Sequence, residues 1–189
     1  MGKKKLSREE ELDMLTTIIL NKGLSADFIV IRPAEYDQIS NKVNNVILER
    51  KTGNIVCTFN EVENVRGSGY MEKEEKVLGR NVKEAGTILK YALIMEDGKF
   101  KPALQIENIP VFYFALSEDS LEKGIKECQS DTLKKKWSNY EKEIFDWFIY
   151  SINSQIKSLK SLASSNPLHP VLNERLSLFE ESIRKYLIV

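Results

Sequence analysis

The order of apolar segments along this chain of 189 residues predicts an α/β fold. Residues 7–116 contain an amphipathic helix, three short β-strands in succession, a second helix and a further apolar strand. The chain from residue 117 onward has the apolar spacing of helices. We therefore expect an α/β core over residues 1–116 and a C-terminal helical layer over residues 117–189, packed together as one domain.

Two amphipathic helices are expected in the core. Ser7 followed three residues later by Glu10 is a capping-box pattern, and an apolar stripe extends from there to Gly23. The second helix follows the glycine-containing residues 67–69. Its expected apolar face is formed by Leu78, Val82, Ala85, Leu89 and Ala92.

Short runs rich in β-branched and aromatic residues predict the strands. Three runs follow the first helix, at residues 28–31, 43–50 and 55–62. The turn at residues 51–54 predicts that the second and third runs form a tight hairpin. A further hairpin is expected around residues 97–98, between runs at 91–95 and 103–106. Residues 109–116 form the most apolar run, and we expect it at the centre of the sheet.

Three helices are expected in the C-terminal layer. A short one starts at Ser117, and a long one starts at Asp131 and carries an apolar residue every three or four positions. Within the long helix, residues 144–150 are apolar nearly all round, which predicts cover by the sheet on one side and by another helix or subunit on the other. The last helix is expected at residues 171–187.

Composition limits the function classes. The 28 basic and 28 acidic residues give zero formal net charge, so a nucleic-acid site would have to be a local patch. Cys57 and Cys128 have neither metal-ligand spacing nor a disulfide pattern, and His169, the only histidine, has no partner for a metal site. No apolar run resembles a signal peptide or reaches membrane-spanning length. We expect a cytoplasmic protein with no membrane partner.

The order helix, three-strand meander, helix, strand resembles the PD-(D/E)XK nucleases of the Holliday-junction resolvase and restriction-endonuclease type. In that family an Asp opens the second strand and a Glu-x-Lys lies on the third. The two carboxylates hold Mg²⁺, and the Lys orients or activates the attacking water. The resemblance covers residues 7–116 and implies a restriction endonuclease-like core, DNA as partner and Mg²⁺ or Mn²⁺ as cofactor.

The chain matches this family motif only in part. The second-strand position falls at Asn45, and the third-strand tripeptide falls at Glu61-Val62-Glu63. Glu61 is the retained acid. An amide at Asn45 lowers the Coulombic attraction to a cation, and Glu63 in place of Lys reverses the charge beside the site. The resemblance thus implies a divergent or degenerate member with Glu61 as main metal ligand and Asp37, Asn45 and Glu63 around it.

Other residues could restore the missing groups. Some family members move the basic residue to the following helix, where Lys73 and Lys76 lie in this chain, so both are candidate catalytic residues. Glu35 or Asp37, just before the second strand, could supply the missing carboxylate.

A second threading takes Glu49-Arg50-Lys51 as the Glu-x-Lys, with Asp27 as the partner acid. It keeps the motif intact, but a strand then follows the signature where the family has a helix. Each candidate also has an interpretation without function. The charged residues at 49–51, 61–63 and 73–76 could all belong to solvated faces of a strand or helix.

Two functions follow from the sequence. The first is a Mg²⁺-dependent nuclease-like protein that binds or cuts DNA, an endodeoxyribonuclease if catalysis is retained. The alternative is a non-catalytic interaction protein on the same fold that dimerises through its C-terminal helices, with Trp147, Phe148 and Tyr150 at the interface. A homodimer is expected in either case. Convergence of the acidic residues in a cleft with a basic rim would favour the nuclease.

Overall fold

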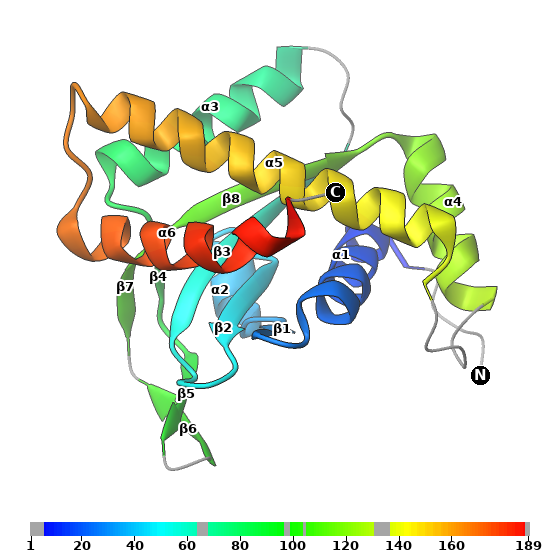
Figure 1. Ribbon diagram of the computed structural model, residues 1–189, viewed down its shortest axis with the longest axis horizontal. Helices are drawn as coiled ribbons and strands as arrows, with labels where there is room; N and C mark the ends of the chain where they lie inside the picture. Colours follow the sequence, from blue (N-terminus) through cyan, green and yellow to red (C-terminus); the bar gives the residue numbers. More distant parts are fainter. Residues whose placement is uncertain (1–5, 64–67, 97–98, 104, 131–136, 188–189) are drawn as a thin grey trace.

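The computed structural model describes residues 6–63, 68–96, 99–103, 105–130 and 137–187, and it has a mixed α/β fold (Figure 1). In chain order the elements are α1 (Arg8–Leu24), β1 (Phe28–Ile31), α2 (Glu35–Ser40), β2 (Asn45–Glu49), β3 (Ile55–Glu63), α3 (Ser68–Lys83), β4 (Thr87–Leu89), β5 (Ala92–Glu96), β6 (Lys99–Ala103), β7 (Ile106–Ile109), β8 (Val111–Leu116), α4 (Glu118–Ser130), α5 (Asn139–Ala163), α6 (Pro170–Ile183) and a 3-10 turn, η1 (Arg184–Tyr186).

The main sheet has four strands in the order β1-β2-β3-β8. The first three form an antiparallel meander, and β8 runs parallel to β3 after the chain has passed through α3. The predicted hairpin of β2 and β3 is confirmed. The first helix is also confirmed. Ser7 caps it by accepting a hydrogen bond from the Glu10 N–H, and the Glu10 carboxylate accepts one from the Ser7 N–H.

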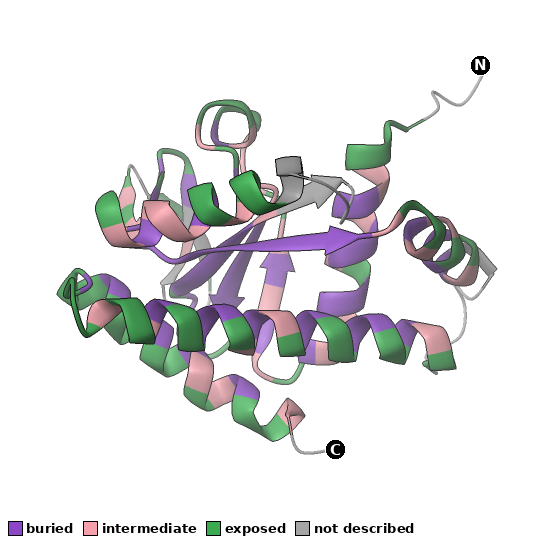
Figure 2. Cartoon of the chain, turned by 90° about the horizontal axis from the view of Figure 1, so that it is seen from above, coloured by how far each residue is buried: buried purple, intermediate pink, exposed green. Residues whose placement is uncertain are grey.

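The prediction that the most apolar strand lies at the centre of the sheet is wrong. β8 is an edge strand, yet all six of its residues are buried. In Figure 2 it runs buried along its length between α5 and α3. A strand that is buried on both faces has a continuous apolar sequence whether it lies at the centre or at the edge of a sheet. The sequence therefore predicts that both faces of β8 are covered, but it does not predict how many strands pair with it.

Side-chain amides bind the outer edges of this sheet. On β8, Asn81 of α3 bonds both the N–H and the C=O of Val111, and Gln155 of α5 does the same for Tyr113. On β1, Asn21 of α1 bonds both backbone groups of Val30. At the far end of β8, the Trp147 indole donates to the Ala115 carbonyl. The bonded edge groups are thereby satisfied without a further strand.

One face of the sheet is covered by α1, α5 and α6, and an aromatic core lies beneath them. Phe59 of β3 stacks on Phe114 of β8 with ring centroids 4.5 Å apart, and Phe114 stacks on Phe148 of α5 at 4.3 Å. The helix α1 and the C-terminal helices α4, α5 and α6 all contribute buried residues to this core. The C-terminal helices are therefore part of the core and do more than cover it.

The other face of the sheet is covered in two separate places. A small apolar cluster that includes Val46, Leu48 and Ile109 packs beneath β4 and β7, the strands of a two-stranded sheet. At the other side, Val77 of α3 packs on Val111 and Tyr113 of β8. The surface between these two clusters is where the candidate site lies.

The second helix is shorter than its apolar spacing predicts. α3 ends at Lys83, and Ala85 and Gly86 adopt the left-handed conformation with φ of 55° and 90°. A Cβ at Gly86 would lie 2.3 Å from the Ile109 carbonyl oxygen, so the turn also requires the small residue sterically. Leu89 and Ala92, expected on the helix, belong to β4 and β5.

Smaller elements differ in a similar way. The hairpin of β5 and β6 is confirmed as an antiparallel pair, with its second strand at 99–103 instead of 103–106, and its turn at 97–98 lies outside the described residues. The helix α2 and the strand pair β4 and β7 were not predicted.

The long C-terminal helix, α5, begins later than predicted. Ser138 caps it with Glu141 in a second capping box, whereas the predicted cap Asp131 lies outside the described residues. The outer face of α5 is largely exposed in Figure 2. Trp147 and Tyr150 are exposed, so the described residues do not cover the apolar segment 144–150 on both sides. No helix among the described residues is both long and apolar enough to cross a lipid bilayer.

Candidate functional site

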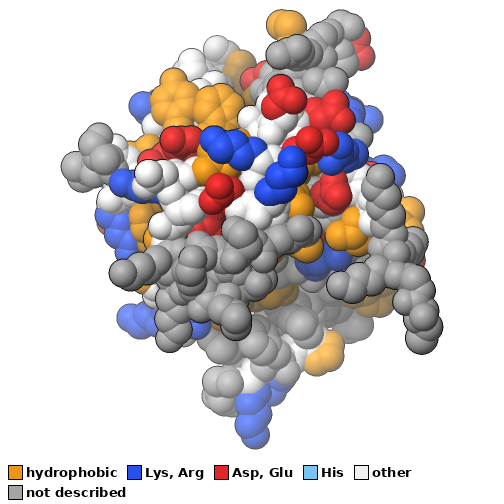
Figure 3. All heavy atoms as spheres, turned by 90° about the vertical axis from the view of Figure 1, so that its right-hand side faces the viewer, with side chains coloured by type: hydrophobic (Ala, Val, Ile, Leu, Met, Phe, Trp, Pro, Cys, Tyr) orange, Lys and Arg blue, Asp and Glu red, His pale blue; other side chains and the backbone are white. Residues whose placement is uncertain are grey.

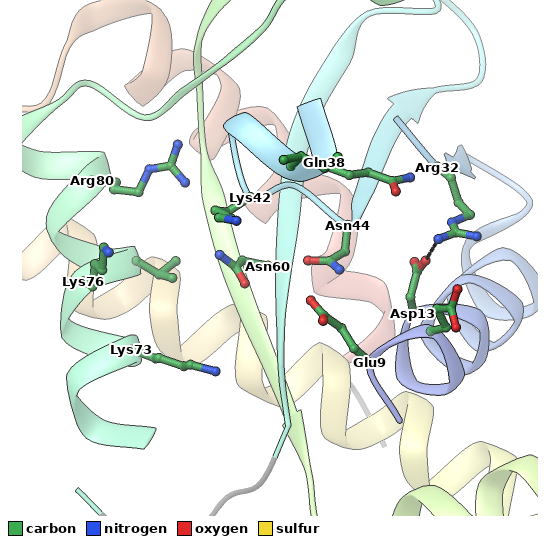
Figure 4. A pocket seen from close by; sticks show the side chains of 13 residues that line it. Glu9, Asp13, Arg32, Gln38, Lys42, Asn44, Asn60, Lys73, Lys76 and Arg80 are labelled. Carbon is green, nitrogen blue, oxygen red and sulfur yellow. Dashed lines mark ion pairs between the residues drawn. The ribbon is translucent and has the colours of Figure 1, made fainter. Parts of the chain in front are cut away.

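A cavity of about 580 Å³ opens between α1 and α3, over the uncovered part of the sheet (Figure 4). We call it the α1–α3 cavity. Each part of its wall comes from a different element, and its lining residues are Glu9, Glu10 and Asp13 of α1, Arg32 after β1, Gln38 and Ile39 of α2, Lys42 and Asn44 before β2, Asn60 of β3, and Lys73, Lys76, Val77 and Arg80 of α3.

The two long walls of the cavity carry opposite charge. Figure 4 shows Lys73 reaching from α3 toward the centre, with Glu9 approaching from α1 on the other side. Described acidic and basic side chains also lie next to each other on the face shown in Figure 3, consistent with zero net charge. An anion would therefore meet attraction only at a local cluster of cations.

Three lysines at the cavity form such a cluster. Lys42, Lys73 and Lys76 are exposed, and none of their ammonium groups makes an ion pair or hydrogen bond with another described residue. Lys42 reaches its position through a left-handed backbone conformation with φ of 53°. We call these residues the lysine cluster. Their ammonium groups are compact cations with several donors each, which suits phosphate oxygens.

Arg80 has a structural role beside the lysine cluster. Its guanidinium donates to the Asn41 carbonyl at 3.0 Å and to the Thr87 hydroxyl at 2.7 Å. Burial lowers the pKa of Arg80 from its usual value, and the nearby Glu84 carboxylate opposes that shift. Arg80 thus ties α3 to the start of β2 and to β4, which fixes the basic wall in place.

Two amides, Asn44 and Asn60, form the floor of the cavity. In the β2–β3 ladder Asn45 is paired with Phe59, so Asn44 and Asn60 lie opposite one another one step further along. The Asn44 N–H donates to the Phe59 carbonyl at 2.8 Å. Side chains alternate between the two faces of a strand, so these amides lie on the face opposite Asn45 and Phe59.

The predicted ligand Asn45 does not line the cavity. Its side chain is fully buried against α1, where it donates to the Asp13 carboxylate at 2.9 Å and accepts from the Thr17 hydroxyl at 2.6 Å. It joins β2 to α1. The cavity residue at this strand start is the neighbouring Asn44.

The predicted ligand Asp37 is also fully buried and outside the cavity. Its carboxylate accepts hydrogen bonds from the backbone N–H groups of Lys90 and Tyr91 at 2.9 and 3.1 Å, and from the Asn41 amide at 2.6 Å. This pattern is that of an acid holding two chain segments together. Glu35, the alternative acid at the start of the same helix, is exposed.

Asp13 is an acid of the cavity that the sequence analysis did not identify. Its carboxylate forms an ion pair with Arg32 at 2.5 Å and accepts the Asn45 amide. Burial raises its pKa above the usual value, with smaller contributions from Glu9 and Glu10, while Arg32 and Asn45 act in the opposite direction. A single buried carboxylate already paired with arginine is a weak ligand for a divalent cation.

The remaining predicted acids, Glu61 and Glu63, lie on β3 in register with Phe114 and Leu116 of β8. Their side chains are outside the described part of the structure, so metal binding by Glu61 stays a prediction. Among the side chains that are described, no three His, Cys, Asp or Glu residues are close enough to hold one metal ion.

The second threading brings Asp27 and Glu49 to neighbouring strand ends, but each carboxylate has a local partner. Asp27 binds Lys185 and accepts a hydrogen bond from the Tyr186 hydroxyl at 3.0 Å. Glu49 accepts one from Thr52 within the β2–β3 turn. Asp27, Glu49 and Lys51 line one small hollow, so the structure brings the residues of the second threading together, with each carboxylate already bonded to another side chain.

Of the site residues predicted from the first threading, Lys73 and Lys76 line the α1–α3 cavity. Asp13, Arg32, Lys42, Asn44 and Asn60 join them there. A weak signal for Asn60 was present in the sequence, as an amide within the apolar third strand run. Arg32 and Asp13 gave none, because their pairing depends on how α1 docks against β1. No protein-family model, no curated protein and no solved structure matches this chain.

Proposed function

We propose that this protein binds nucleic acid in the α1–α3 cavity of a nuclease-like core. The observation that carries the proposal is the lysine cluster, three ammonium groups without an internal partner among the described residues, beside two amides on neighbouring strands. Lysines that bind phosphates supply sequence-independent affinity, and amide side chains can bind base edges or sugar hydroxyls.

The arrangement of elements supports the same proposal. The order α1, β1 to β3, α3, β8, with an antiparallel meander and a last strand parallel to β3, agrees with the core expected from the PD-(D/E)XK resemblance. The cavity lies over the start of β2 and the middle of β3, the neighbouring strands on which that family carries its carboxylates. Fold alone does not carry activity, so the proposal depends on the cavity residues.

Asparagines on the cavity floor favour binding over hydrolysis. Asn44 and Asn60 are uncharged, which removes most of the attraction that concentrates Mg²⁺ between two strands. Hydrolysis would depend on Glu61 as a metal ligand. Glu61→Gln is therefore the variant that separates a metal nuclease from a binding protein.

The test measures binding of fluorescently labelled single-stranded, linear duplex and branched DNA by anisotropy over a range of salt concentrations. Lys73→Glu and Lys76→Glu should each weaken binding about tenfold or more and lower the salt slope by roughly 0.7 to 0.9 for each phosphate that the variant no longer neutralises. Lys126→Glu is the matched control, because Lys126 is an exposed lysine of α4 that does not line the cavity. Absence of binding, or an equal decrease in the control, would contradict the proposal.

Cleavage is assayed on the same samples with Mg²⁺, Mn²⁺ or EDTA. Cutting that requires metal and disappears in Glu61→Gln while binding persists would make the protein a divergent metal nuclease. DNA binding without cutting in any of these conditions would leave a non-catalytic nucleic-acid binder, the outcome that the amide floor favours.

A second candidate function, protein interaction through a homodimer, rests on the outer face of α5. Trp147 and Tyr150 are 45% and 62% exposed, and their rings stack with centroids 6.2 Å apart. A hollow beside Trp147 is lined by the end of β8 and the start of α4. Exposed aromatic pairs are common at interfaces.

Sedimentation should give a dimer that Trp147→Ala weakens and Leu178→Ala, another exposed apolar position, does not. A wild-type monomer at high micromolar concentration would remove this candidate.

A further inference from the structure

We propose that the nucleic acid bound at the α1–α3 cavity is single-stranded, with unpaired bases packing on an aromatic surface next to the lysine cluster. This inference rests on the proposed function and extends it to the strandedness of the ligand. The aromatic surface consists of Tyr36 on α2 and Tyr91 after β4, which we call the tyrosine pair.

The tyrosine pair is an exposed pair of rings with a cation beside it. Tyr36 and Tyr91 are 44% and 56% exposed, and their centroids lie 5.6 Å apart at an interplanar angle of 87°. The ammonium of Lys90 lies 4.7 Å from the Tyr36 centroid and 5.6 Å from that of Tyr91. Aromatic rings with a lysine ammonium beside them are groups that bind a base together with its phosphate.

The tyrosine pair adjoins the cavity. The helix α2 that carries Tyr36 also supplies Gln38 and Ile39 to the cavity wall, and Ile39 lies one helical turn from Tyr36 with 61% of its surface exposed. Tyr91 lines a second hollow that shares Arg32 with the cavity. A chain of nucleotides could thus run from the lysine cluster across α2 to the two rings.

Asp37 holds the tyrosine pair in position. Its buried carboxylate, on the residue after Tyr36, accepts the backbone N–H groups of Lys90 and Tyr91. The two rings come from segments more than fifty residues apart in sequence, and this acid fixes one segment against the other. A surface that is ordered before the ligand arrives loses less entropy on binding.

Base pairing decides between the two forms of nucleic acid. In a duplex each base stacks on its neighbours and its faces are unavailable to protein side chains. Bases of a single strand can stack on aromatic rings whatever their sequence, while lysines follow the backbone. The combination of the lysine cluster and an adjacent tyrosine pair therefore matches a single strand better than a duplex, which would use the lysines alone.

The experiment compares a labelled oligodeoxyuridylate of about 12 nucleotides, the oligouridylate of the same length and a blunt duplex, at one salt concentration. The single strands should bind more tightly than the duplex. Tyr36→Ala and Tyr91→Ala should each weaken single-strand binding by roughly 5- to 100-fold. Tyr36→Phe and Tyr91→Phe should retain it, because the ring is kept. Tyr150→Ala, which removes an exposed ring on α5, is the matched control.

The outcomes separate this inference from the proposed function. Duplex binding as tight as single-strand binding, or alanine variants of the tyrosine pair that behave like Tyr150→Ala, would overturn the inference even if Lys73→Glu still abolished binding. Failure of the wild type to bind any of the three probes would overturn both. Equal affinity for the two single strands would support a site that ignores the 2′-hydroxyl, and a preference for one would identify its source as DNA or RNA.

Discussion

Replacing Asp37 with alanine tests whether this buried acid is structural or a metal ligand. The carboxylate accepts three hydrogen bonds, two of them from the backbone N–H groups of Lys90 and Tyr91. Hydrogen bonds to a charged group contribute about 1.5 to 3 kcal/mol each. Because Lys90 and Tyr91 are exposed residues, water can recover part of this stabilisation once the acid is removed. We expect Asp37→Ala to lower the free energy of unfolding by about 2 to 4 kcal/mol.

Urea denaturation followed by circular dichroism measures this change, and Glu35→Ala is the matched control. Glu35 lies on the same short helix, but its side chain is exposed, so its removal should cost less than about 1 kcal/mol. Both variants and the wild type are measured with Mg²⁺ and with EDTA. If Asp37 were a metal ligand, Mg²⁺ at a hundred times its dissociation constant would stabilise the wild type by about 2.7 kcal/mol.

Two results would refute the reasoning. In the first, Asp37→Ala is no less stable than Glu35→Ala, and the three hydrogen bonds then contribute nothing measurable. In the second, Mg²⁺ stabilises the wild type but not Asp37→Ala. The acid would then bind metal in solution, in agreement with the prediction from sequence and against the geometry.

Two further predictions concern stability. Gly23→Ala should destabilise the fold by about 1 to 3 kcal/mol, because its Cβ would lie 2.1 Å from the Phe145 ring. Gly79→Ala should stabilise α3 by about 0.5 to 1 kcal/mol, because a Cβ there would have no atom within 4 Å. Equal urea midpoints for the two variants would contradict this. The pKa of Asp27 is lowered, chiefly by its hydrogen bond with Lys185, so its contribution is complete above about pH 4 and disappears as the pH falls further. Asp27→Asn should therefore show a smaller decrease in stability between pH 5 and about pH 2.5 in thermal melts, and an unchanged acid profile would count against the interaction.

Elements with local signals were predicted well. The capping box at Ser7 and Glu10 and the β2–β3 turn are specified by residues close in sequence, and both are confirmed. Elements whose structure depends on tertiary packing were predicted less well. The apolar residues Leu89 and Ala92 continue the helical spacing of α3 by coincidence and serve strands instead. The short helix α2 has no side-chain cap and only six residues, too few for a periodic pattern.

The candidate site was predicted less well, because strand phase decides which residue faces a cavity. The resemblance placed the second-strand position at Asn45, and the ladder instead turns Asn44 to the cavity and Asn45 to α1. A shift of one residue exchanges a surface role for a core role. The pairing of Asp13 with Arg32 joins elements about twenty residues apart and needed the fold itself.

The amides bound along the outer strands limit how this protein can meet another. A partner that extends a sheet needs a row of vacant N–H and C=O groups. At Val30 on one border, and at Val111 and Tyr113 on the other, those groups are occupied by Asn21, Asn81 and Gln155. Incoming strands, from a peptide or a second copy, would have to displace them. A contact that leaves these amides in place would have to use another surface, such as the helices. Edge-to-edge pairing is thus disfavoured at these positions, even though β8 is the most apolar strand described.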